Sequence, residues 1–194
     1  MNRYFLIVAA LVVGLCFQAC NARKTTDEQG TNSTTATAST AEPAADVSVT
    51  GRLADLGLTS DSHWRGINLG DAFSNVKSTE KGEPFESDEN HIGYTVEFKN
   101  LESADMLYYQ KNQNVSAINV DLFLNNQQSV DGYKKELEPY FTARYGTAKA
   151  VNGSSVWTGP KGETITLKDV SKGKDFGLKI RIAQGEGAIT ASTK

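Results

Sequence analysis

The chain has 194 residues, with 20 Lys and Arg against 23 Asp and Glu, and a net charge of −3. This length allows one folded domain with short appendages. The composition, 39% hydrophobic and 22% charged, is typical of a folded chain and not of a disordered one. The slight acidic excess argues against a nucleic-acid-binding protein, which usually carries a basic surplus. Two cysteines and two histidines leave few residues for a metal centre or a disulfide framework.

Residues 1–19 have the pattern of a bacterial lipoprotein signal peptide. Arg3 supplies the positive flank, and residues 5–17 form an apolar run, shorter than the roughly 20 residues that a spanning helix needs. Residues 17–20, Phe-Gln-Ala-Cys, resemble the bacterial lipobox, and the small residue before Cys20 predicts that Cys20 carries acyl chains such as palmitate. Cys16 does not fit this pattern, because a bulky leucine precedes it. The alternative is an ordinary secretory signal, although no good small-x-small cleavage site precedes Cys20.

Residues 20–52 are predicted to be the lipidated cysteine and a flexible tether. Residues 21–50 hold 8 Thr, 3 Ser and 6 Ala and no aromatic residue. Such a segment cannot bury enough apolar surface to offset the entropy lost on ordering. The absence of Asp directly after Cys20 resembles lipoproteins that are sent to the outer membrane. The predicted location is therefore the cell envelope, with the folded domain in the periplasm or at the cell surface. Once Cys20 is acylated and the leader removed, no thiol is left for a disulfide or a zinc thiolate site.

A single folded domain is expected over residues 53–184, and it begins with a short helix. Gly70 and Asp71 predict a turn, with Asp71 capping a helix that ends near Ser78. Three strands are expected next, over residues 92–98, 106–109 and 118–124. The first and last of these alternate apolar and polar residues, which is typical of half-buried strands. The short polar links between them predict an antiparallel meander.

The second half begins with the longest predicted helix, over residues 128–145. Its apolar side chains fall in one stripe about 100° wide: Val130, Tyr133, Leu137, Tyr140 and Phe141. Pro139 lies opposite the stripe, and Gly146 is placed for a C-terminal cap. Three more strands are expected, over residues 154–158, 163–170 and 175–183, followed by a flexible tail at 185–194. The predicted fold class is α+β, with two tandem α-β-β-β units that form an antiparallel sheet with helices on one face.

Two segments carry a family resemblance. Residues 66–71, Gly-Ile-Asn-Leu-Gly-Asp, precede a short helix that Gly-Glu-Pro closes at 82–84, and Tyr145-Gly146 is followed by a hairpin with Trp157. This resembles the repeat of small envelope lipoproteins of the outer-membrane assembly type and of β-lactamase inhibitory proteins. The resemblance implies a protein that binds other proteins and is not an enzyme. The chain departs from those repeats by showing one helix per unit where they often have two.

The sequence offers little for catalysis or metal binding. His63 and His91 are 28 residues apart and lack the spacing of a metal pair. Residues 80–89 contain five carboxylates, but without the alternation and glycine turn of a calcium loop, so we expect a solvated loop. No nucleophile elbow and no phosphate loop are present. The sequence therefore predicts no catalytic residue, no metal site and no cofactor.

Charge is unevenly distributed along the chain. Residues 80–105 carry eight acids and two bases, whereas residues 144–181 carry eight bases and three acids. Either the two segments attract each other within the fold, or they form a dipolar surface that orients a partner. Because Tyr108 and Tyr109 are adjacent in one strand, one of them points away from the core, where tyrosine is a common interface anchor. The candidate partner-binding residues are Tyr108, Tyr109, Lys172 and Lys174, the two lysines lying in a predicted exposed turn.

These patterns predict a non-catalytic envelope lipoprotein that acts as a protein-binding adaptor or inhibitor, with an envelope protein as partner. The alternative is a lipoprotein that binds a small ligand or an ion on the concave sheet. An enzyme is the third class, and the missing motifs make it the least supported. A flat sheet with exposed aromatic side chains favours the first class, and a large polar-lined concavity favours the second.

Overall fold

The structure is a computed structural model that describes residues 48–185. The predicted leader at 1–19, Cys20, the tether up to residue 47 and the tail at 186–194 lie outside these residues. The first half contains α1 (Arg52–Asp55), α2 (Ser74–Thr79), β1 (Glu86–Ser87), β2 (His91–Glu97), β3 (Ser103–Lys111) and β4 (Asn114–Leu124). The second half contains α3 (Gln127–Tyr145), β5 (Lys149–Val151), β6 (Ser154–Thr158), β7 (Glu163–Asp169) and β8 (Phe176–Gln184). Within the described residues, no helix is long and apolar enough to cross a membrane.

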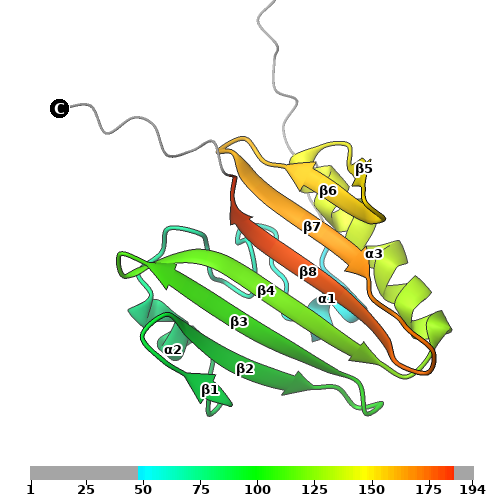
Figure 1. Ribbon diagram of the computed structural model, residues 1–194, viewed down its shortest axis with the longest axis horizontal. Helices are drawn as coiled ribbons and strands as arrows, with labels where there is room; N and C mark the ends of the chain where they lie inside the picture. The colour runs from blue at the N-terminus through cyan, green and yellow to red at the C-terminus, as the bar shows by residue number, and fades with distance from the viewer. Residues whose placement is uncertain (1–47, 186–194) are drawn as a thin grey trace, which may run out of the picture. The chain divides into compact units, whose positions relative to one another are not determined.

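All eight strands form one antiparallel sheet in the order β1-β2-β3-β4-β8-β7-β6-β5 (Figure 1). The two halves of the chain meet in the middle, where β4 pairs with β8 from Ala117–Ala183 to Leu124–Phe176. A Cβ atom at Gly177 would lie 2.6 Å from the Leu122 carbonyl oxygen, so glycine is needed for β8 to approach β4 this closely. The predicted mixed α+β class with an antiparallel sheet is confirmed.

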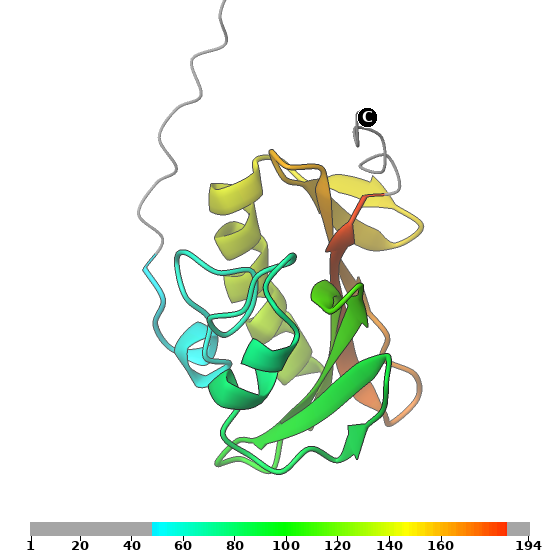
Figure 2. The same ribbon diagram turned by 90° about the vertical axis from the view of Figure 1, so that its left-hand side faces the viewer.

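The long helix α3 and the short helices cover one face of this sheet (Figure 2). The stripe predicted for α3 is buried in full, and its residues share one core with Trp64, Trp157 and the inward side chains of the central strands. The Asn126 side chain caps α3 by accepting a hydrogen bond from the Ser129 amide at 2.9 Å. Gly146 ends the helix at a φ of 81°, which suits glycine. Pro139 lies on the exposed side and leaves the helix continuous.

Each half has four strands where the sequence predicted three. The additional strands, β1 and β5, are two and three residues long and lie at the two edges of the sheet. Strands this short show no alternation to detect. Helix α1 was also not predicted, because its four residues are too few to show a helical period. The first half thus has two short helices, and the second has one long helix.

Two further predictions are corrected locally. Asp71 does not cap α2: its carboxylate accepts a hydrogen bond from the Asn68 amide at 2.7 Å, and the N-cap position belongs to Phe73, which makes no side-chain cap bond. Strand β3 runs over Ser103–Lys111 and is longer than the predicted 106–109. Its polar residues, such as Asp105, point to the face opposite the helices and therefore broke the apolar run.

Candidate functional site

The first candidate surface is the face of the sheet opposite the helices. In β2, β3 and β8, and in β4 from Ala117 onward, the even-numbered side chains face the helices and the odd-numbered ones point the other way. No described helix lies on this second face (Figure 2). We call it the open face. Among the described strands it carries polar and charged residues together with a few large apolar ones.

The strand register sorts charge across the open face. Cross-strand pairing places Asp105 of β3, Asp121 of β4, Lys179 of β8 and Lys168 of β7 in one row. Asp121 and Lys179 form an ion pair of 3.1 Å at the centre of that row. In the next row, the Arg181 guanidinium donates a hydrogen bond to the Asn119 side chain at 2.9 Å. The acidic side chains thus lie on β3 and β4, and the basic ones on β8 and β7.

The two charged segments of the sequence contribute only part of their charge to this face. Glu80 and Glu102, both from the acidic segment, are buried, with 3% and 2% of their surface exposed. The expected solvated loop is therefore wrong for Glu80. Lys168, Lys179 and Arg181 of the basic segment are exposed on the open face. Charge along the chain identified the segments but not which of their members reach the surface.

An apolar patch lies at one end of the open face, and we define it by Phe123 and Val170. Phe123 is 53% exposed and Val170 is 43% exposed. Together with Asp121, Asp175, Lys179 and neighbouring residues, these two side chains line a shallow hollow of about 250 Å³. Large exposed apolar side chains set among charges are typical of protein contact sites. Sequence reasoning missed Phe123, although its signal was present: it is a large apolar residue at an outward position of an alternating strand.

The predicted partner-binding residues have different surroundings. Lys172 and Lys174 are exposed in the turn that leads from Val170 to Phe176, so they lie beside the apolar patch. Tyr109 points to the open face, where its ring centre is 5.4 Å from that of the His91 imidazole. Tyr108 is fully buried, and we remove it from the candidates because no partner can reach it.

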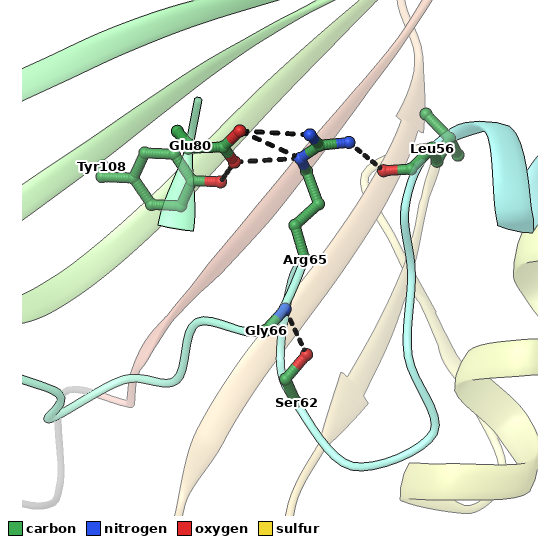
Figure 3. A network of polar contacts seen from close by, with 6 residues as sticks. All are labelled: Leu56, Ser62, Arg65, Gly66, Glu80 and Tyr108. Carbon is green, nitrogen blue, oxygen red and sulfur yellow. Dashed lines mark hydrogen bonds and ion pairs between the residues drawn. The ribbon is translucent and has the colours of Figure 1, made fainter. Parts of the chain in front are cut away.

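Tyr108 instead belongs to a buried polar network (Figure 3). Its hydroxyl donates a hydrogen bond of 2.5 Å to Glu80, and the Arg65 guanidinium holds the same carboxylate at 2.9 and 3.1 Å. Arg65 also donates to the Leu56 carbonyl oxygen at 2.9 Å. Burial, and then the nearby negative charge of Glu80, raise the pKa of Tyr108 well above its usual range, so the phenol stays a donor. The network ties the loop before α2 to strand β3, and its role is structural.

The two histidines acquire acidic neighbours that the sequence did not indicate. The His91 Nε2 atom lies 2.7 Å from Glu86, and its Nδ1 atom lies 3.0 Å from Asp88. His63 Nδ1 lies 2.8 Å from the Asn68 side chain, and its Nε2 lies 3.8 Å from the buried Glu163. Within residues 48–185, no group of three or more His, Cys, Asp or Glu side chains is placed to hold a metal ion.

A second hollow of about 520 Å³ lies at the end of β2, beside α1 and α3. Its walls include Arg52, Phe98, Lys99, Glu102 and Tyr133. Its polar groups are largely satisfied: Arg52 bonds to Glu136 at 3.0 Å, and Glu102 accepts hydrogen bonds from Asn100 and the Asn125 amide. Burial raises the pKa of Tyr133 to about 12.

Comparisons with family models, with curated proteins and with solved structures found no match to this chain.

Proposed function

We propose that this chain is a non-catalytic lipoprotein of the bacterial cell envelope, anchored by acyl chains on Cys20, whose folded region binds another protein as an adaptor or inhibitor. The outer membrane is the proposed site of the anchor, and the absence of Asp directly after Cys20 supports it. The observation that carries the binding function is the open face, because it combines the exposed apolar patch with the sorted charges. An exposed aromatic surrounded by polar groups is the usual form of an interface anchor.

The fold adds a second, finer proposal. The strand order is symmetric about the β4–β8 pair, since each half contributes its fourth strand to the centre and its first to an edge. We infer that the two halves are tandem units of one type. This supports the resemblance to the repeat of outer-membrane assembly lipoproteins and β-lactamase inhibitory proteins, to which the binding function also corresponds.

Site-specific photo-crosslinking in intact envelopes tests the binding function. A crosslinking residue at Phe123 should capture a protein, whereas the same residue at Lys135, exposed on α3 on the other side of the sheet, should not. Equal capture at both positions, or none at Phe123, would contradict binding through the open face.

The lysines beside the patch make the test quantitative. Lys172→Glu with Lys174→Glu should slow association with the captured partner, and the wild-type rate should fall as salt rises, because exposed charges act on the rate of encounter. Lys77→Glu with Lys135→Glu, which makes the same change of charge on the helices, is the matched control. An association rate that ignores both salt and the first pair of substitutions would exclude steering by this turn.

The hollow beside Tyr133 favours a second candidate, a lipoprotein that binds a small charged ligand. We rank it second because the Arg52–Glu136 and Glu102–Asn100 bonds would have to break or rearrange to receive a ligand. A thermal-shift screen of small charged molecules tests it: a true ligand should raise the melting temperature of the wild type but not of Lys99→Ala.

A further inference from the structure

We propose that the open face binds a second copy of this chain, in a two-fold dimer in which the acidic half of each face lies over the basic half of the other. The inference rests on the proposed function, since it names the partner of the same face. It follows from the position of the charges relative to the centre of the sheet.

The boundary between the two charges coincides with the β4–β8 pair. On one side of it, the row that contains Asp121 continues to Asp105, and on the other side it continues from Lys179 to Lys168. The row therefore runs through two acids and then two bases, at the regular spacing of about 4.8 Å between neighbouring strands. Lys111, at the tip of the β3–β4 hairpin, lies beyond this row.

A two-fold axis parallel to the strands, in the plane between two stacked faces and over the β4–β8 boundary, preserves every row. It places β4 over β8 of the second copy and β3 over β7 of the second copy. Asp121 then faces Lys179 of the second copy, and Asp105 faces Lys168 of the second copy. Because such an interface is isologous, each of these contacts occurs twice.

The uncharged positions agree with the same arrangement. In the row of Tyr109, the register places Ala117, Ala183 and Thr164. The operation sets the large Tyr109 against Thr164 of the second copy, and Ala117 against Ala183 of the second copy. The one large side chain of this row is thus opposed by a smaller one, which suits sheets that stack about 10 Å apart.

Size and charge balance also favour a second copy. Six strands about 4.8 Å apart and about 24 Å long present roughly 700 Å², close to the roughly 800 Å² that each partner contributes to a standard interface. A partner of one charge would be repelled by half of the open face. A second copy has both charges at the same strand spacing and in the opposite order, so each charge in the row from Asp105 to Lys168 faces an opposite charge.

Charge-reversing substitutions in two differently tagged full-length chains test the proposal, with co-purification of the two tags as the measurement. The chains are produced together, cross-linked in their membranes and purified through one tag. Wild-type chains should co-purify at low salt. Asp105→Lys alone, or Lys168→Asp alone, places like charges opposite each other twice and should lower recovery of the second tag about tenfold. Combining one chain of each variant restores both attractions and should bring recovery back to within about twofold of the wild type.

Matched controls distinguish a loss of pairing from a loss of folding. Asp131→Lys and Lys135→Asp make the same exchanges at exposed positions of α3 and should leave recovery unchanged. A urea-unfolding midpoint close to that of the wild type shows that each open-face variant is folded. Folded single variants that still pair, or whose mixture does not recover pairing, would overturn the dimer.

The co-purification and the crosslinking at Phe123 together distinguish failure of the dimer from failure of the proposed function. If wild-type chains do not co-purify while Phe123 captures a different protein, the dimer fails and the binding function stands. If the chains pair but Phe123 captures only a second copy, the dimer stands and the adaptor role fails. If Phe123 captures nothing at all and the chains do not pair, both are rejected.

Discussion

Removing Arg65 should strongly destabilise the fold, because it leaves the Glu80 carboxylate buried without its counter-charge. Glu80 is 3% exposed, and the Arg65 side chain is 22% exposed. Breaking a buried ion pair by removing one member costs about 3–5 kcal/mol. Arg65 is partly exposed, and the Tyr108 hydroxyl still donates to the carboxylate. We therefore expect Arg65→Met to lower the free energy of unfolding by about 3 kcal/mol, the lower end of that range. With a urea m-value of about 1.5 kcal/mol/M, the urea concentration at which half of the protein is unfolded should fall by about 2 M.

A double variant separates the charge effect from the loss of packing. Arg65→Met with Glu80→Gln keeps an acceptor for the Tyr108 hydroxyl but buries no charge, so it should be about 1–2 kcal/mol more stable than Arg65→Met alone. Unfolding can be followed by tryptophan fluorescence, because Trp64 and Trp157 are both fully buried. A cost of less than 1 kcal/mol for Arg65→Met, or a double variant as unstable as the sum of its parts, would refute the reasoning.

Three further predictions concern the core, the pH dependence and the anchor. Leu137→Ala should cost about 2–5 kcal/mol in urea unfolding, whereas Lys135→Ala on the exposed side of α3 should change stability by less than about 0.5 kcal/mol; equal effects would mean that the buried stripe is misassigned. Burial raises the pKa of Glu102, but hydrogen bonds from Ser129, Asn125 and Asn100 together lower it below its ordinary value of 4.5. This stabilisation is present above that ordinary pKa and is lost as pH falls through the lower, folded-state pKa, so unfolding measured against pH should show a smaller acid-side loss for Glu102→Gln than for the wild type. Cys20→Ala should abolish acyl labelling and release the chain from membranes, and unchanged membrane association would exclude the lipid anchor.

The local pattern of the sequence was sufficient for the larger elements. The apolar period of α3 identified its buried stripe, and the alternation in β2, β4 and β8 identified which residues face the core. These predictions succeed because an amphipathic element of seven or more residues repeats its own signal. The short edge strands β1 and β5 were not predicted, because they are too short to repeat a pattern. Their pairing with β2 and β6 defines them, and their composition does not.

The surface charges show what the sequence by itself determined and what only the tertiary structure decided. Composition along the chain determined that one acidic and one basic segment exist. Whether a given carboxylate is buried depended on a partner distant in sequence: Arg65 precedes Glu80 by 15 residues, and the Asn125 amide follows Glu102 by 23. The pairing of β4 with β8, some 60 residues apart, then placed Asp121 beside Lys179 and divided the open face into two charged halves. Contacts of this kind join segments whose local patterns are independent, so only the folded chain specifies them.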